Sequence, residues 1–200
     1  MDNASEQFSP DRKKNLEQMG MEGLLAALTS EDDVYLRRHA AYLLGRAGDP
    51  SVVPFLIRAL SDTDKEVREQ AMLALSAIGQ AAIEPLKKAM EDPKWETRYR
   101  AVEALGKIAD ERVVSPLIKA LNDERDHVRY MAAKGLRETG NSQSIDPLIA
   151  LLRDENEFVR MMAAKGLGVI GGERIHAALE QALMNEKNER VKAAITEAMN

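Results

Sequence analysis

A nine-residue segment near the middle of the chain returns 31 residues later with a single change. Residues 128–136 read VRYMAAKGL, and residues 159–167 read VRMMAAKGL. The first two residues of this segment form a pair in which an apolar residue or Thr is followed by Arg or Lys. Such pairs recur at steps of 31, 30, 31, 31 and 32 residues. They begin at Leu36, Val67, Thr97, Val128, Val159 and Val191. Six copies at one period predict a repeat protein, in which each unit stacks on its neighbours.

Each repeat is expected to contain two helices. In the fourth repeat, residues 112–123 place apolar side chains at helical spacing, with Pro116 in the first turn, where its missing N–H does no harm. Residues 126–140 carry apolar and small residues on one side of a second helix, which Gly140 ends. The proline recurs every 31 residues, as Pro54, Pro85, Pro116 and Pro147. No strand pattern is present, so the prediction is an all-α stack of helical hairpins.

The predicted architecture is a right-handed α-solenoid of about six hairpins. A polar tail, residues 1–15, precedes one continuous domain, residues 16–200. The expected repeats are approximately 17–48, 49–79, 80–110, 111–141, 142–172 and 173–200. The last repeat is degenerate, as expected of a capping unit, since Ala178 replaces the proline and Lys192 the arginine.

The recurring phrase V-R-x-x-A-A-x-A-L-G-x-I-G-D, followed by a P-L-I-x-A-L helix, resembles the short HEAT-like repeat of phycobilisome lyases. The resemblance extends over residues 17–200 and implies a HEAT-like fold, with the second helix of each repeat lining a concave surface. It is much less specific for function, because one fold serves many functions.

The resemblance also implies a ladder of Asp and Arg side chains between adjacent repeats. In four repeats an Asp precedes the recurring Arg by six residues: Asp62 and Arg68, Asp92 and Arg98, Asp123 and Arg129, Asp154 and Arg160. A row of arginines can also bind phosphates, but here a carboxylate accompanies every cation. We therefore favour the structural role, to which the planar guanidinium is well suited.

The second helices also carry a stripe of residues that differ from repeat to repeat. Its positions lie at offsets 0, 3, 4, 7 and 11, within a wedge of roughly 100°, and they include all four tyrosines of the chain. Aromatic and Met side chains are enriched in interface cores. The predicted partner-binding residues are Tyr35, Arg38, His39, Tyr42, Trp95, Tyr99, Arg100, His127, Tyr130, Met131, Lys134, Phe158, Met161 and Met162. The alternative for any one of them is simple packing against the next repeat.

Composition narrows the possible functions. The net charge of −5 and the absence of a continuous basic track disfavour nucleic-acid binding. The chain has no cysteine, no signal-peptide pattern and no apolar run long enough to span a membrane. These features predict a cytoplasmic protein with no membrane partner.

The sequence contains no convincing catalytic or cofactor motif. Residues 166–171 match G-x-G-x-x-G, but they close a helix, whereas a dinucleotide-binding loop opens one. The His-Glu pairs of the HEAT-like deoxyhypusine hydroxylases are absent, and His39 and His127 lie three repeats apart. We expect no enzyme activity, metal or cofactor.

The sequence therefore predicts a scaffold that binds a protein or peptide on its concave face. Tyr99, Tyr130, Met161 and Phe158 are its expected energetic centre. The alternative is a phycobilin-lyase-like or chaperone-like subunit for a tetrapyrrole-carrying protein, and nucleic-acid binding is the weakest of the three.

Overall fold

The computed structural model describes residues 15–108 and 110–200, and every regular element in those ranges is helical. The predicted tail falls on residues 1–14, outside the described residues, except for its last position. The chain divides after Ala89 into two compact units, each of which is described by itself. This division falls inside the predicted third repeat, residues 80–110. The single continuous domain stays a prediction.

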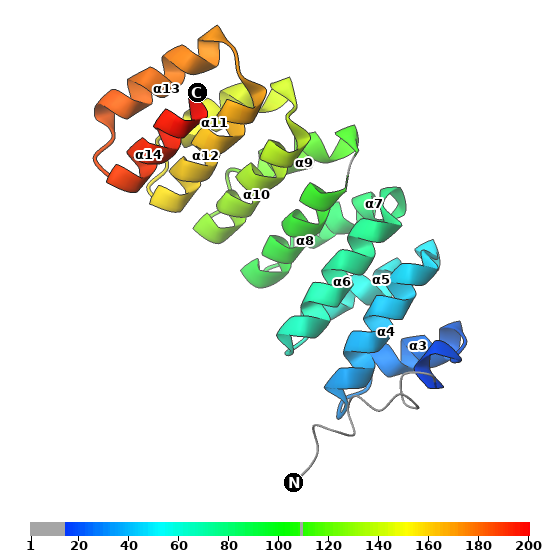
Figure 1. Cartoon of the computed structure of the whole chain (residues 1–200). Helices are drawn as coiled ribbons and strands as arrows, with labels where there is room; N and C mark the ends of the chain where they lie inside the picture. Colours follow the sequence, from blue (N-terminus) through cyan, green and yellow to red (C-terminus); the bar gives the residue numbers. More distant parts are fainter. Residues whose placement is uncertain (1–14, 109) are drawn as a thin grey trace. The chain divides into compact units, whose positions relative to one another are not determined.

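Unit 1 stacks short hairpins of helices (Figure 1). Helix α4 packs beside α6, with α3 against α4 and α5 against α6, and α7 contacts both α5 and α6. Its elements are α3 (Met21–Leu28), α4 (Val34–Ala47), η1 (Pro50–Val52), α5 (Val53–Ala59), α6 (Lys65–Ile78) and α7 (Gln80–Ala89).

Unit 2 repeats this plan. Helices α8, α10, α12 and α14 pack side by side in one row, and α9, α11 and α13 each pack against a helix of that row (Figure 1). Its elements are α8 (Trp95–Lys107), η2 (Glu111–Val113), α9 (Val114–Ala120), α10 (Asp126–Thr139), η3 (Ser142–Ser144), α11 (Ile145–Leu151), α12 (Glu157–Ile170), α13 (Glu173–Asn185) and α14 (Glu189–Ala198). The predicted pair of helices per repeat is therefore present.

Polar caps begin several second helices. The side chain of Asp64 accepts hydrogen bonds from two backbone amides at the start of α6, and Asn156 does the same for α12. These contacts satisfy amides that the helix leaves without an internal partner. Pro116 lies in the first turn of α9, as predicted, whereas Pro85 lies inside α7 because that helix begins earlier, at Gln80.

Leucine and alanine form the core of both units, and glycine lets two helices of unit 2 approach closely. Leu44, Leu105, Leu136 and Leu167 are completely buried. A Cβ atom added at Gly106 would lie 2.8 Å from the Cα of Gly135, which is closer than real side chains come. Backbone therefore meets backbone between α8 and α10, and this pair of glycines sets their separation.

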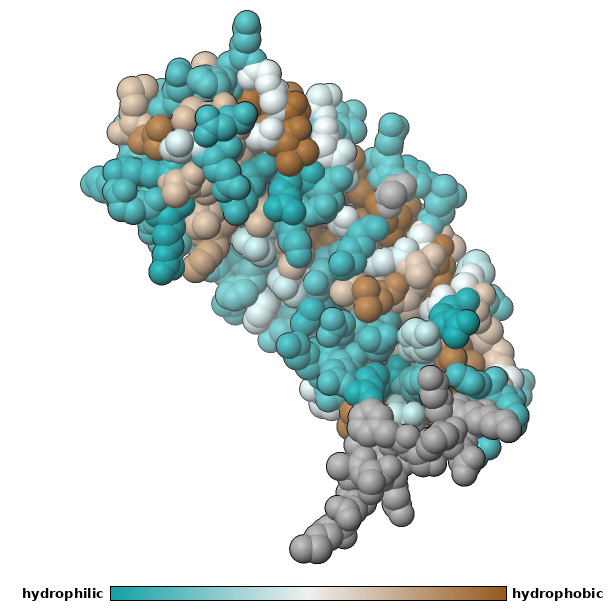
Figure 2. Space-filling model, viewed as in Figure 1, coloured by the Kyte–Doolittle hydropathy of each residue, from teal (hydrophilic) through white to brown (hydrophobic). Residues whose placement is uncertain are grey.

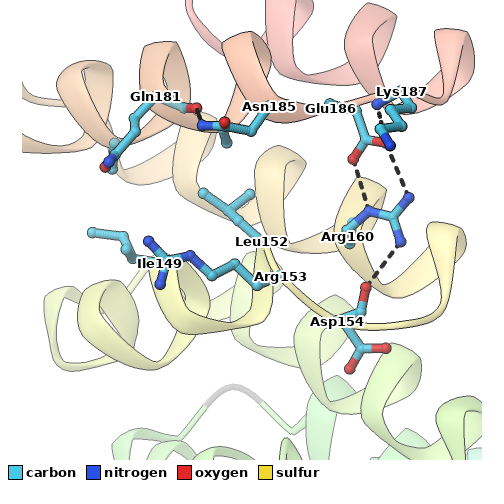
Figure 3. A pocket seen from close by; sticks show the side chains of 11 residues that line it. Ile149, Leu152, Arg153, Asp154, Arg160, Gln181, Asn185, Glu186 and Lys187 are labelled. Atoms are coloured by element: carbon cyan, nitrogen blue, oxygen red, sulfur yellow. Dashed lines mark hydrogen bonds and ion pairs between the residues drawn. The ribbon is translucent and has the colours of Figure 1, made fainter.

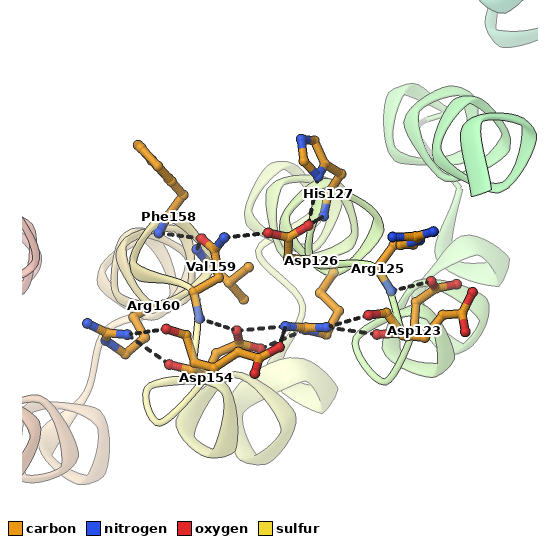
Figure 4. A network of polar contacts seen from close by, with 12 residues as sticks. Asp123, Arg125, Asp126, His127, Asp154, Phe158, Val159 and Arg160 are labelled. Carbon is orange, nitrogen blue, oxygen red and sulfur yellow. Dashed lines mark hydrogen bonds and ion pairs between the residues drawn. The ribbon is translucent and has the colours of Figure 1, made fainter.

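The recurring arginines join consecutive repeats. Arg129 donates from Nε and Nη2 to the two carboxylate oxygens of Asp154, at 2.7 and 2.9 Å, and from Nη1 to the carbonyl oxygen of Asp123 at 3.0 Å (Figure 4). Arg160 makes the same paired contact with the carboxylate of Glu186. In unit 2, Arg98, Arg129 and Arg160 thus each bond to the backbone carbonyl of the Asp six residues earlier, and the carboxylate comes from the following repeat.

Arg37 and Arg68 show both sides of this arrangement in unit 1. The guanidinium of Arg37 donates to both carboxylate oxygens of Asp62, at 2.8 and 3.1 Å. Arg68 donates to the backbone carbonyl oxygen of the same Asp62, at 2.7 Å. One aspartate therefore serves two arginines, through its side chain and through its backbone.

Candidate binding surface

Three neighbouring helices of unit 2 bring part of the predicted set together. Helices α8, α10 and α12 pack side by side, and each carries large side chains that are at least partly exposed. We call these residues the aromatic stripe: Trp95 and Tyr99 on α8, His127 and Tyr130 on α10, and Phe158 and Met161 on α12. Phe158 is 51% exposed.

Ring contacts connect the stripe across two helices. The ring of Trp95 meets that of Tyr99 edge to face, with centroids 6.5 Å apart, and lies 5.2 Å from the ring of His127 on α10. The guanidinium of Arg100 lies 4.9 Å from the centre of the Tyr99 ring and pairs with Glu103 at 2.7 Å. Such contacts hold the aromatic side chains in place before any partner arrives.

The hydroxyl of Tyr99 remains a hydrogen-bond donor at neutral pH. Burial raises its pKa above the ordinary value, and the negative charge of Glu103 raises it further, while Arg100 acts in the opposite direction. Because the phenol keeps its proton, Tyr99 offers a partner both a ring and a polar group.

A pocket of about 320 Å³ lies between α10 and α12. It is lined by Asp126, His127, Tyr130, Asn156 and Phe158. Asp126 Oδ1 is 2.7 Å from both the backbone nitrogen and the Nδ1 atom of His127. The other carboxylate oxygen, Oδ2, accepts from the amide of Asn156 at 2.5 Å. We call this space the Asp126 pocket.

The Asp126 carboxylate is ionised at neutral pH. Burial acts to raise its pKa, but the hydrogen bonds from His127 and Asn156 outweigh this, and the pKa lies below the ordinary value. The pocket therefore combines three rings with one negative charge.

A second hollow, of about 370 Å³, lies between α8 and α10. Gly106, Gly135 and the buried Met131 line it, together with four charged residues, Glu103, Lys107, Lys134 and Glu138. Its two acids and two bases give it no dominant charge.

Three residues of the predicted set are not on the exposed surface. Tyr35, Met131 and Met162 are 7%, 5% and 8% exposed. Tyr35 stacks on His39 with centroids 5.7 Å apart and ring planes at 5°. Met131 and Met162 lie on α10 and α12, each of which has a packed helix on either side. All three side chains pack inside their units, and their direct contact with a partner stays a prediction.

The remaining predicted residues of unit 1 lie around α4. Arg38 forms an ion pair with Glu66 of α6, and His39 lies between Tyr35 and Tyr42 along the helix. Tyr42 is 43% exposed, with the guanidinium of Arg46 5.8 Å from its ring centre. Only Tyr42 of this group presents a largely open ring.

Sequence reasoning missed Asp126 and Asn156. The amide of Asn156 links α12 to the start of α10 through Asp126, and Asn188 likewise bonds to Glu157 at the start of the preceding second helix. The sequence offered one signal for these contacts: an Asn precedes each of the two helices, and an acid lies about one repeat period before each Asn.

A larger cavity, of about 610 Å³, lies between α11 and α13, the helices outside the row that bears the stripe (Figure 3). Arg160, paired with Glu186, forms part of its wall, and Arg153 and Leu152 line another part. Asp154, Arg160 and Glu186 in its wall belong to the inter-repeat ladder and already bond to one another.

The face of the molecule shown in Figure 2 is largely polar. On this face (Figure 2), hydrophilic side chains predominate, and hydrophobic ones form separate patches instead of one continuous band.

Among residues 15–108 and 110–200, no helix has the length and apolar character needed to cross a bilayer. Within the same described ranges, no group of three or more His, Asp or Glu side chains has an arrangement suited to a metal ion.

Two curated proteins resemble parts of this chain. The uncharacterized phycocyanin operon protein Z of Pseudanabaena tenuis is 31% identical over 93 residues, which are 42% of this chain and 46% of that protein. Deoxyhypusine hydroxylase of Danio rerio is 42% identical over 66 residues, 32% of this chain and 22% of the enzyme. The chain thus spans less than half the length of these curated relatives.

The fold also resembles a solved structure, the complex of CpcE and CpcF of phycocyanin lyase from Nostoc sp. PCC7120. The TM-score is 0.70 at 24% identity, with 76% of this chain and 100% of that chain covered. A model of HEAT repeats matches residues 21–93, 80–129 and 114–200. Together with the stacked hairpins, this match shows that the chain belongs to the HEAT-repeat family.

Proposed function

We propose that this chain is a non-catalytic scaffold that binds a protein or peptide partner through the aromatic stripe of unit 2. One observation carries the proposal: three adjacent helices place exposed or half-buried rings and a Met side by side. The ladder residues, by contrast, already bond to each other. Large rings of this kind supply contact area at low entropic cost and are enriched among the residues that dominate binding.

The variation among repeats supports the same conclusion. The residues shared by the repeats pack inside or join neighbouring helices, as the buried leucines and the Arg129–Asp154 pair show. At the positions of the stripe the repeats differ, and α6 carries Glu69 and Leu73 where α8 has Tyr99 and Glu103. Positions whose residue type the shared fold does not dictate are available for recognition.

Charge on the stripe argues for a protein partner over a nucleic acid. Asp126 lies among the rings, and Glu103 lies close enough to Tyr99 to act on its hydroxyl. A phosphate backbone would be repelled by both carboxylates. The lysines and arginines nearby alternate with acids instead of forming a track.

The test is affinity capture from a lysate of the source organism. The full chain would be compared with a Tyr99→Ser, Tyr130→Ser, Met161→Ser variant, and both would first be shown equally helical by circular dichroism. A matched control changes three exposed residues elsewhere, Met19→Ser, Val34→Ser and Met184→Ser, which are 40%, 41% and 78% exposed.

A protein retained by the wild type and the control but lost by the stripe variant supports the proposal. Equal capture by all three chains would show that binding uses another surface. The retained protein would then be purified and its dissociation constant measured against each variant.

A second candidate is an accessory role for a tetrapyrrole-carrying protein, favoured by the likeness to the phycocyanin operon protein and to the lyase complex. Titration of the chain with bilin or haem tests it directly. A saturable shift of the pigment's absorbance bands supports this role, and unchanged spectra at stoichiometric concentrations contradict it.

A further inference from the structure

The Asp126 pocket has an unusual combination of walls for a surface hollow. Its rings come from two helices, His127 and Tyr130 from α10 and Phe158 from α12. His127 and Phe158 project to the same side of the two helices, with Asp126 between them (Figure 4). The rings therefore flank a carboxylate.

The lining favours a cation over other ligands. Aromatic faces attract positive charge, and the attraction grows as the cation loses water. Asp126 is the only charged residue among the described residues that line the pocket. An anion would meet that carboxylate at close range, and a purely apolar group would gain nothing from its charge.

Asp126 also retains capacity for another donor. An ionised carboxylate has about four acceptor positions. The described contacts use three of them: the backbone nitrogen and Nδ1 of His127 on Oδ1, and the Asn156 amide on Oδ2. One further hydrogen bond fits on Oδ2, which faces the space between α10 and α12.

The charges around the pocket are mixed. Arg125 precedes Asp126, and Lys134 lies one turn beyond Tyr130 on α10. Glu155 and Glu157 flank Asn156 on the other side of the pocket. The charge that selects a ligand is therefore that of Asp126 itself, which lines the pocket.

We infer that the Asp126 pocket binds one arginine side chain of the partner. The planar guanidinium stacks on the rings of His127 and Phe158 and donates a charge-assisted hydrogen bond to Asp126, a combination that suits arginine better than lysine. This inference rests on the proposed scaffold function and specifies the chemistry of the partner.

The experiment uses the full chain and two seven-residue peptides of Gly and Ser. One peptide has a central arginine, and the other has citrulline, which keeps the shape of arginine without its charge. Trp95 is the only tryptophan of the chain and lies 5.2 Å from the ring of His127. Its fluorescence and its indole N–H signal in NMR spectra therefore report on occupation of the pocket.

The arginine peptide should give a saturable change at millimolar concentrations, as expected for one anchoring side chain, and the citrulline peptide should bind about tenfold more weakly. Asp126→Asn should reduce arginine binding to the citrulline level. Phe158→Leu, which keeps an apolar group but removes the ring, should weaken it by about threefold. The control, Glu138→Gln, changes another carboxylate of α10 and should leave the affinity unchanged.

Equal binding of the two peptides, no binding of either, or full arginine binding by a correctly folded Asp126→Asn variant would overturn the inference. The experiments distinguish a wrong arginine site from a wrong proposal of scaffold function. If the arginine peptide does not bind while the stripe variant still loses its captured partner, only the arginine site is wrong.

Discussion

Arg98 and Asp123 lie 25 residues apart and form a two-point ion pair, with Nε 2.8 Å from Oδ2 and Nη2 2.9 Å from Oδ1. Both side chains are largely buried, at 10% and 12% exposure. The pair ties α8 to the loop before α10, and Arg129 with Asp154 repeats the connection one unit later. Adjacent second helices are thus joined by a contact that one repeat supplies to the next.

Replacing Arg98 by Met should lower the free energy of unfolding by about 3 kcal/mol, because Asp123 would remain buried without its cation. Urea denaturation followed by circular dichroism measures the change. Lys119→Met is the matched control, since its ion pair with Glu91 is exposed, and it should cost less than about 1 kcal/mol. A similar loss in both variants would show that the ladder does not stabilise the stack.

The ladder should also make the protein sensitive to acid. The hydrogen bond from Arg160 lowers the pKa of Glu186, and at Asp123 the contacts with Arg98 lower the pKa despite the opposing effect of burial. A folded-state pKa below the unfolded value gives stability that is complete above the unfolded pKa and is lost as pH falls through the folded one.

The melting temperature should therefore fall as pH drops from about 5 towards 2. Asp123→Asn removes one of the titrating groups, so the variant should start less stable and should lose less stability over that range. Thermal melts of both chains at several pH values test this. Parallel curves for the two proteins would exclude a contribution from Asp123.

Gly106→Ala should destabilise unit 2, although alanine favours helix formation by about 1 kcal/mol over glycine. The new Cβ would lie 2.8 Å from the backbone of Gly135, and overpacking of this kind costs about 1–3 kcal/mol. Gly166→Ala is the control, because its nearest contact is the end of the flexible Leu148 side chain, at 3.1 Å. Chemical denaturation should show a loss for the first variant and little change for the second.

The two tyrosines of α4 should behave differently. Tyr35→Ala removes a buried ring and should cost about 3 kcal/mol, whereas Tyr42 is 43% exposed and its removal should change stability by less than about 1 kcal/mol. The free energies of unfolding of the two variants decide the point. A larger loss for Tyr42→Ala would contradict the packing described for unit 1.

The repeat period predicts the ladder's residue types but not which carboxylate meets which arginine. Asp123 stands six residues before Arg129 in the sequence, yet its carboxylate binds Arg98 and only its carbonyl oxygen contacts Arg129. The six-residue spacing within one repeat determines the contact between the Arg side chain and the backbone carbonyl of the Asp. Contacts between repeats depend on how the helices stack.

The helical wheel likewise predicts the direction of a side chain but not its depth. Met131 and Tyr130 are neighbours on α10, but Met131 is buried and Tyr130 is partly exposed. The wheel treats α10 as a single cylinder, whereas in the unit it has α8 on one side and α12 on the other.

The sequence by itself determined the period, the two helices of each repeat and the apolar side of each helix, because these follow from local spacing and helix geometry. The tertiary structure alone decided which edges of the stripe are covered, where the Asp126 pocket opens and how Asn156 reaches Asp126. These features depend on the distance between helices, which is set by contacts such as that of Gly106 with Gly135, some 30 residues apart in the sequence.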